Sequence, residues 1–166
     1  MLYMRILGID PGIATTGWAV VDFDDSGNTL PADYGAIFTP KQASVGERLL
    51  ELYHDLKEIV EKFEPDYCGL ETLLFYNNAK TAIVVGEARG VALLVLEELG
   101  IPVHEFTPLQ VKSSISGYGK ADKRQVGENV KMLFNLKEIP KPDDVSDALA
   151  ISIACFDRLK MDKLLK

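Results

Sequence analysis

The stretch GIDPGIATTGW, residues 8–18, decides the fold of this chain. The mainly apolar run of residues 4–9 ends in the ionisable Asp10, and Pro11 and Gly12 follow at once. Because proline and glycine favour turns, this pattern predicts a buried strand that presents a carboxylate at its carboxyl end. Asp10 either only begins the turn or forms part of a site, and other parts of the sequence must distinguish the two.

The composition is typical of one globular domain. The chain has 166 residues, of which 47% are hydrophobic, and a domain of this size buries roughly 70% of its unfolded surface. No apolar run approaches the roughly 20 residues of a membrane span, and the first residues lack a signal-peptide pattern. Cys68 and Cys155 have apolar neighbours and no metal-ligand spacing, as expected of reduced core cysteines. We therefore expect a cytoplasmic protein with no membrane partner and a single domain over residues 1–166.

The charge is acidic overall but unevenly distributed. A formal net charge of −7 argues against a nucleic-acid partner, because phosphate binding requires basic surface. Residues 106–135 differ, with five basic side chains against two acidic ones. Much of the acid excess lies in residues 51–66 and at the ends of predicted elements. The net charge is therefore weak evidence against nucleic-acid binding.

The hydrophobic pattern predicts a mixed α/β domain. Strands are predicted over residues 4–10, 16–23, 33–39, 66–71 and 101–106, and the first three have short links typical of an antiparallel meander. Helices are predicted from the Ser44–Glu47 capping box to about 63, over 79–99, from Thr107–Pro108 onward, over 122–134 and over 143–159. Residues 161–166 are expected to form a frayed tail.

Four acids share one context, at strand tips or at the start of a helix. Asp10 ends the first predicted strand and Glu71 ends the fourth, whereas Asp144 and Asp147 share one face in the first turn of the last helix. If the two strands are parallel neighbours, Asp10 and Glu71 lie side by side at the ligand-binding edge of the sheet. Grouped carboxylates repel one another unless a cation neutralises them, and oxygen-only ligands favour Mg²⁺ or Mn²⁺. A pair of such ions can support phosphodiester hydrolysis.

Each acid also has an ordinary explanation when taken alone. Asp10 could begin a turn, Glu71 could be an exposed strand end, and the acids near 144 could cap a helix. Capping does not explain acids at the tips of two separated strands. The sequence has no GxxxxGK[ST], HExxH or GxSxG motif, and we expect His54 and His104 to be structural.

Four blocks of this sequence together resemble one known family. The blocks are GIDPGIATTGWAV, GLETLLFYNNAKTAIVVGEARGVALL, FTPLQVKSSISGYGKADKRQV and KPDDVSDALAISI. In this order and spacing, over about residues 4–157, they resemble the RuvC family of Holliday-junction resolvases, which belong to the RNase H-like nucleases. The four blocks together are far more specific than a single DPG or DxxD would be.

The resemblance implies a fold, an activity and a set of partners. The fold is RNase H-like, with a five-stranded mixed sheet flanked by helices. The activity is Mg²⁺-dependent cutting of two opposing strands of a four-way DNA junction, which leaves ligatable 5′-phosphate ends for recombination and repair. We expect a homodimer, two Mg²⁺ ions per subunit that Mn²⁺ can replace, and cooperation with the RuvA–RuvB branch-migration complex. The family's catalytic and metal-binding acids fall on Asp10, Glu71, Asp144 and Asp147.

The resemblance also implies DNA contacts. The family's stacking aromatic falls on Leu74 here, so we favour the adjacent Phe75, with Tyr76 as the other nearby ring. Lys112 and Lys123 match phosphate-contacting positions of the family. Weaker candidates for DNA contact, for which surface solubility is the alternative explanation, are Lys80, Arg89, Lys120 and Arg124. The predicted helix over 79–99, too apolar for one buried face, is the expected dimer interface.

Three other functions remain open from the residues. An RNase H-like nuclease of the YqgF type would act on RNA and shares the DxG strand. An actin-like or sugar-kinase module would bind ATP with a hairpin like residues 10–17, although that class needs two such domains. A non-catalytic junction-binding scaffold would have no need of all four acids. Activity on a four-way junction, on RNA and on ATP separates these functions.

Overall fold

The computed structural model describes residues 3–30, 33–73, 79–117 and 119–165. The strands are β1 (Met4–Asp10), β2 (Thr15–Phe23), β3 (Asp33–Phe38), β4 (Tyr67–Glu71) and β5 (Val103–Phe106). The helices are α1 (Val45–Phe63), α2 (Ala79–Glu98), α3 (Pro108–Ser116), α4 (Lys123–Leu133) and α5 (Asp143–Leu164). The order of elements matches the sequence prediction, and the Ser44–Glu47 capping box is present at the start of α1.

The sheet has the strand order β3-β2-β1-β4-β5. β1, β2 and β3 form the predicted antiparallel meander, whereas β4 lies parallel to β1 and β5 lies parallel to β4. The predicted five-stranded mixed sheet is therefore confirmed. Because β1 and β4 are parallel neighbours, their carboxyl ends meet at one edge of the sheet.

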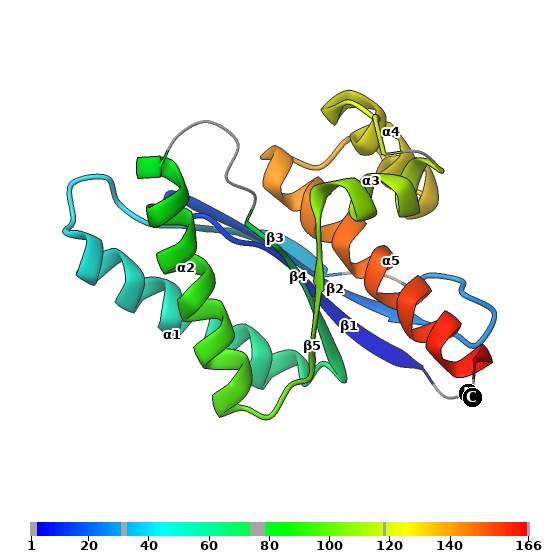
Figure 1. Ribbon diagram of the computed structural model, residues 1–166, viewed down its shortest axis with the longest axis horizontal. Coiled ribbons are helices and arrows are strands. Elements are labelled where there is room, and N and C mark those ends of the chain that lie inside the picture. Colours follow the sequence, from blue (N-terminus) through cyan, green and yellow to red (C-terminus); the bar gives the residue numbers. More distant parts are fainter. Residues whose placement is uncertain (1–2, 31–32, 74–78, 118, 166) are drawn as a thin grey trace.

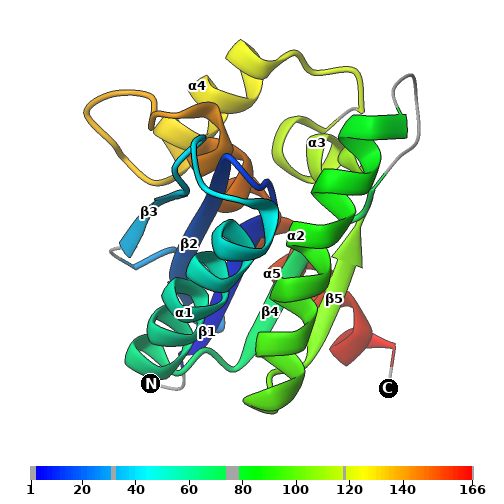
Figure 2. The same cartoon turned by 90° about the vertical axis from the view of Figure 1, so that its left-hand side faces the viewer.

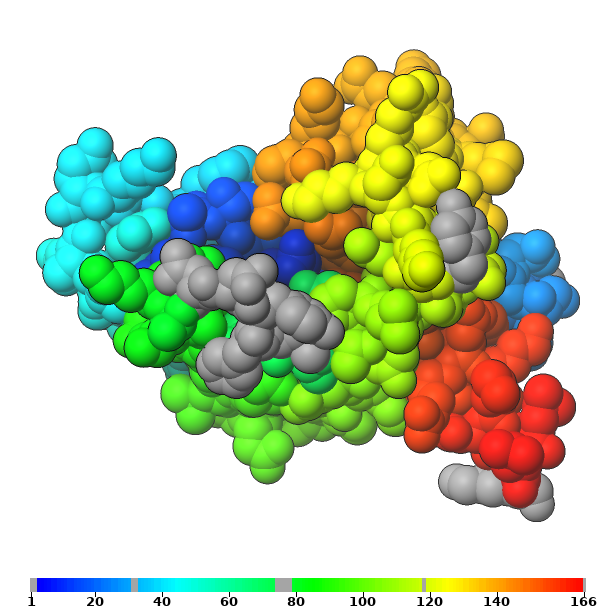
Figure 3. Space-filling view, turned by 45° about the horizontal axis from the view of Figure 1, so that its top comes forward, coloured from blue at the N-terminus to red at the C-terminus, as the bar shows by residue number. Residues whose placement is uncertain are grey.

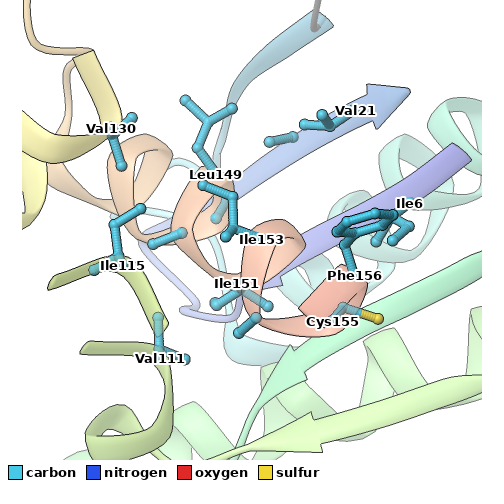
Figure 4. Close-up of a cluster of buried hydrophobic side chains, with 14 of the residues drawn as sticks. Ile6, Val21, Val111, Ile115, Val130, Leu149, Ile151, Ile153, Cys155 and Phe156 are labelled. Carbon is cyan, nitrogen blue, oxygen red and sulfur yellow. The ribbon is translucent and has the colours of Figure 1, made fainter. Parts of the chain in front are cut away.

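Helices cover both faces of the sheet. α1 and α2 lie against one face, and α5, with α3 and α4 beside it, lies against the other (Figures 1 and 2). Side chains along β1 alternate between the two faces, so the core has two parts. Leu7 and Ile9 belong to the cluster under α1 and α2, whereas Ile6 belongs to the cluster around α5. Figure 4 shows this second cluster gathered around α5.

Three glycines on neighbouring strands allow α5 to lie unusually close to the sheet. A Cβ atom added to Gly8 would lie 2.9 Å from the backbone nitrogen of Ser152, and one added to Gly69 would lie 2.8 Å from a methyl carbon of Ile151. A Cβ added to Gly17 would overlap the backbone of Asp144. Since contacts this short are not tolerated in a packed interior, the absence of these side chains sets the position of α5.

The last helix extends beyond its predicted end at residue 159. α5 continues to Leu164, so residues 161–164 are helical. The sequence contains neither proline nor glycine after Pro142 to end the helix. An ion pair four residues apart, with Arg158 Nε 3.2 Å from Asp162 Oδ1, also favours this last part of the helix.

The two cysteines and the two histidines have the environments of structural residues. Cys68 and Cys155 are free and buried. His104 packs its ring against Tyr67, and His54 lies on the exposed side of α1 beside Tyr53. Within the described ranges, none of the helices is both long enough and apolar enough to cross a membrane.

Candidate active site

Asp10 and Glu71 lie together because β1 and β4 end at the same edge. Ile9 pairs with Leu70 in the parallel ladder, so the next residue along each strand is an acid. Both apolar residues point into the core beneath α1 and α2, and alternation therefore turns the two acids toward the face that carries α5. The two carboxyl groups lie close enough for the charge of Glu71 to raise the pKa of Asp10.

Asp144 and Asp147 come from the first turns of α5. Asp10 pairs with Gly17 across the β1–β2 ladder, and the backbone of Asp144 packs directly on Gly17. This contact places the start of α5 over the end of β1. The four acids predicted from the sequence are thus brought to one edge of the sheet by three elements that are far apart in the chain.

The turn between β1 and β2 is held by buried hydroxyl groups. Thr16 Oγ1 donates to the Gly12 carbonyl oxygen at 2.6 Å and accepts from the Gly12 amide at 3.2 Å. Thr39, which is 6% exposed, donates from its hydroxyl to the Ile13 carbonyl oxygen. Arg48 Nε in turn donates to Thr39 Oγ1 at 2.9 Å. The turn that follows Asp10 is therefore held by hydrogen bonds from Thr16 in β2 and from Thr39 just after β3.

The electrostatics of the cluster disfavour its fully charged state. Burial, followed by the charges of Glu71, Asp147 and Asp144, raises the pKa of Asp10 well above its usual value. The pKa of Glu71 is also raised, mainly by burial and next by the charge of Asp147. Burial raises the pKa of Asp147 to about 6, with Asp144 adding to the shift. Grouped, half-buried carboxylates therefore retain protons unless positive charge is supplied.

Two lysines supply part of that charge. Lys123 at the start of α4 lowers the pKa of Asp10, Glu71 and Asp147. Lys112 in α3 lowers the pKa of Glu71 and Asp147. Lys123 Nζ also lies 3.7 Å from Asp143 Oδ2, in an exposed ion pair. The two lysines for which the sequence resemblance implies phosphate contact thus both lie near the acid cluster.

The other predicted DNA contacts have different positions. Phe75 and Tyr76, together with Leu74, lie outside the described residues. Lys80, in the first turn of α2, lines a groove that also includes Asp144. Lys120 is exposed in the turn before α4.

The two arginine candidates do not face the acid cluster directly. Arg89 Nη2 lies 2.7 Å from Glu105 Oε1, in an ion pair between α2 and β5. Its Nε is buried and lacks a hydrogen-bond partner among the described residues. Arg124 lines a separate polar cleft with Asp122, Glu128 and Asn129. Arg89 therefore joins α2 to β5 through an ion pair, Arg124 lies at a cleft on α4, and their contact with DNA stays a prediction.

The donor chemistry of the cluster fits a hard divalent cation. Among the described residues, no three Asp, Glu, His or Cys side chains are close enough together to hold a metal ion as they lie. The four acids nevertheless offer only oxygen atoms, and the pKa values of Asp10, Glu71 and Asp147 are raised, mainly by burial and further by the charges of neighbouring carboxylates. Mg²⁺ and Mn²⁺ prefer such ligands and would relieve this repulsion.

Sequence reasoning missed the residues that position the acids. Gly17 lies within the stretch that predicts the first strand, but its contact with Asp144 depends on packing between distant elements. Thr39 and Arg48 carry no motif that would link them to the turn after Asp10. The neighbouring Asp143 has the sequence context of a helix-capping acid, although it pairs with Lys123.

The strand order is that of the RNase H-like fold, and the acids at the ends of β1 and β4 fit a nuclease of this fold. A family model described as crossover junction endodeoxyribonuclease RuvC matches residues 6–155. The chain therefore belongs to this family, as the sequence resemblance predicts.

Individual relatives agree with this assignment along nearly the whole chain. A crossover junction endodeoxyribonuclease RuvC of Chloroflexus aurantiacus is 53% identical over 150 residues, covering 90% of this chain and 91% of that protein. The structure of Thermus thermophilus RuvC matches with a TM-score of 0.84 at 32% identity, over 96% of this chain and 97% of that one. T. thermophilus RuvC in complex with a Holliday junction substrate matches with a TM-score of 0.86 at 30% identity, over 95% and 96% of the two chains.

Proposed function

We propose that this chain resolves four-way DNA junctions by divalent-metal-dependent hydrolysis of opposing strands, in recombination and repair. The observation that carries the proposal is the meeting of Asp10, Glu71, Asp144 and Asp147 at one edge of the sheet, in a member of the RuvC family. Each acid alone has a structural explanation, but their convergence from three elements does not. Raised pKa values at this edge favour a binding role for the cluster.

The four acids would hold Mg²⁺, with Mn²⁺ as a substitute and two ions per subunit. When bound, these ions would activate a water molecule and stabilise the leaving oxygen of the cut phosphodiester. The protein's own contribution is to hold the carboxylates rigidly, through the β1–β4 ladder and the packing of α5 on Gly17. Lys112 and Lys123 would bind phosphates beside the cluster and thereby offset the repulsion between DNA and acids.

A homodimer would present two such sites to the two opposing strands. α2 supports this proposal because it exposes apolar side chains on the side away from the core, with Ile83 61% and Leu94 60% exposed. Gly86 and Gly90 have open space around them, so a second helix could approach closely between those side chains. We place the dimer interface on α2, and we propose RuvA–RuvB as the partner complex in the cytoplasm.

The decisive test is Asp10→Asn assayed on a synthetic four-way junction with Mg²⁺. We expect cutting to be lost and junction binding to be kept or improved, because one negative charge near phosphate is removed. Cutting at the wild-type rate would overturn the catalytic assignment. Wild-type chain that cuts single-stranded or duplex RNA instead of the junction would favour the RNA-processing alternative. ATP hydrolysis that is lost in the same variant would favour the nucleotide-binding alternative.

A further inference from the structure

An open groove lies beside the acid cluster and is lined by three separate parts of the chain. Its described lining residues are Gly12–Thr15 from the β1–β2 turn, Lys80, Thr81, Val84 and Val85 from α2, and Asp144 from α5. In Figure 3 the blue atoms of the β1–β2 region lie between the green atoms of α2 and the orange atoms at the start of α5. Its volume is about 500 Å³, within the range of about 300–1,000 Å³ typical of small-molecule pockets.

The lining of this groove separates an apolar part from a polar part. Ile13 is 9% exposed, and Val84 and Val85 are half-buried, so these side chains offer a fixed apolar surface. Thr15 and Thr81 bring hydroxyl groups, and Lys80 brings a positive charge. Apolar side chains do not bind phosphate, but they pack against the faces of sugars and bases. The edges of a base can form hydrogen bonds with threonine hydroxyl groups.

Asp144 belongs both to the groove and to the acid cluster. A DNA strand whose cut phosphate lies at the cluster therefore has a neighbouring nucleotide within reach of the groove. We propose that the groove takes the sugar and base of the nucleotide next to the cut phosphate, with Lys80 binding the phosphate beyond it. This inference rests on the proposed function, since it takes the acids as the site of cutting.

The position of the groove beside the acid cluster and the charge of Lys80 indicate that a DNA strand occupies the groove. The helix stripe proposed for the dimer contains Ile83 and Leu94, which are strongly exposed, whereas the groove residues of α2 turn toward the β1–β2 turn. The groove is therefore separate from that interface. Its only described cation, Lys80, comes from the first turn of α2. A basic side chain at the margin of an apolar groove suits an anionic strand better than it suits an apolar peptide.

Cross-linking tests the position of the nucleotide directly. Because Cys68 and Cys155 are buried, a Val85→Cys chain has one accessible thiol. The probe is a four-way junction in which one base carries a tether that ends in a mixed disulfide with a small thiol. This base lies on either side of the cut phosphate, or at a distant position on the same strand. Without divalent metal, the introduced cysteine attacks the mixed disulfide, bonds to the tether and releases the small thiol. We expect at least about tenfold more disulfide product at one flanking position than at the distant one. The matched control is Met132→Cys, on an α4 side chain that is 73% exposed, and it should show no such preference.

Filling the groove gives a second, independent measurement. Val85→Trp should lower kcat/KM for junction cutting at least about tenfold while leaving the sedimentation coefficient unchanged. Met132→Trp, at an exposed α4 position outside the groove, should cut normally. If the junction binds but Val85→Cys cross-links equally to all tether positions, the groove assignment is wrong. Normal cutting by Val85→Trp would also overturn it. If the unmodified chain neither binds nor cuts a junction, the proposed function itself fails, and this result is distinguishable from the other two.

Discussion

The backbone of Asp144 occupies the space that a side chain on Gly17 would need. A Cβ atom added to Gly17 would lie 2.9 Å from the Asp144 Cβ and would overlap the Asp144 carbonyl group. Because Gly17 is also the ladder partner of Asp10, its contact with Asp144 links Asp10 to Asp144. The spacing of the acids therefore depends on a residue that has no functional group of its own.

Gly17→Ala should displace the start of α5 and separate Asp144 from Asp10. We expect a loss of about 1–3 kcal/mol in the free energy of unfolding, as for other overpacked interiors, and a larger proportional loss of junction cutting. Urea unfolding and single-turnover cutting measure the two effects. Gly46→Ala in α1 is the matched control, since Gly46 has open space around it, and alanine there should be neutral or stabilising. Normal cutting by Gly17→Ala would show that this contact does not set the site.

Asp10→Asn should stabilise the metal-free protein at neutral and higher pH. The pKa of Asp10 is raised in the fold by burial and by Glu71, so the folded state holds its proton more tightly than the unfolded state does. Stability is therefore lost as pH rises above the unfolded value, and the asparagine, which has no proton to lose, avoids this loss. We expect a gain of about 1–3 kcal/mol at pH 8 that shrinks toward pH 4.

Urea unfolding across pH in a chelating buffer measures this gain. Asp25→Asn, on an exposed loop residue, is the control and should show no comparable gain. A gain for Asp10→Asn that stays constant with pH would contradict the electrostatic explanation.

Mg²⁺ should offset the stability difference between wild-type protein and Asp10→Asn. An ion that binds only the folded wild-type protein stabilises it by about 2.7 kcal/mol at one hundred times its dissociation constant. Asp10→Asn and Asp147→Asn should gain much less, because each removes a carboxylate from the cluster. Thermal unfolding with increasing Mg²⁺ or Mn²⁺ measures the difference. Equal stabilisation of wild-type and variant proteins would place the ion elsewhere.

Lys123→Ala should weaken junction binding and make it less sensitive to salt. Lys123 faces Asp10, Glu71 and Asp147, so a phosphate bound beside the cluster lies within its reach. Loss of one phosphate contact reduces the slope of log affinity against log salt by about 0.9.

Titrations of binding at several salt concentrations, in the absence of divalent metal, give this slope. Lys163→Ala, in the last turn of α5, is the matched lysine control. Asp143→Asn should leave affinity unchanged or slightly increased, because its ion pair with Lys123 is exposed and contributes little. An unchanged salt slope for Lys123→Ala would mean that it binds no phosphate.

The sequence predicts local features of this fold better than it predicts contacts between distant elements. The Ser44–Glu47 capping box and the Thr107–Pro108 helix start are both present, because each is determined by a few neighbouring residues. The sequence predicts that Asp10 and Glu71 lie side by side only if β1 and β4 are parallel neighbours, and this assumption is correct. The contact of Gly17 with Asp144 and the pairing of Arg89 with Glu105 depend on tertiary packing, which no local pattern encodes.

Thr39→Val should impair the site without touching any acid. The Thr39 hydroxyl donates to the Ile13 carbonyl oxygen and accepts from Arg48 Nε, so valine leaves two part-buried polar groups unpaired at a cost of about 1–3 kcal/mol. Because Ile13 lies in the turn that follows Asp10, we expect cutting to fall more than junction binding. Thr39→Ser keeps the hydroxyl and should restore both stability and cutting, which separates the hydrogen bonds from the packing of the methyl group. Equal defects in the valine and serine variants would assign the effect to packing alone.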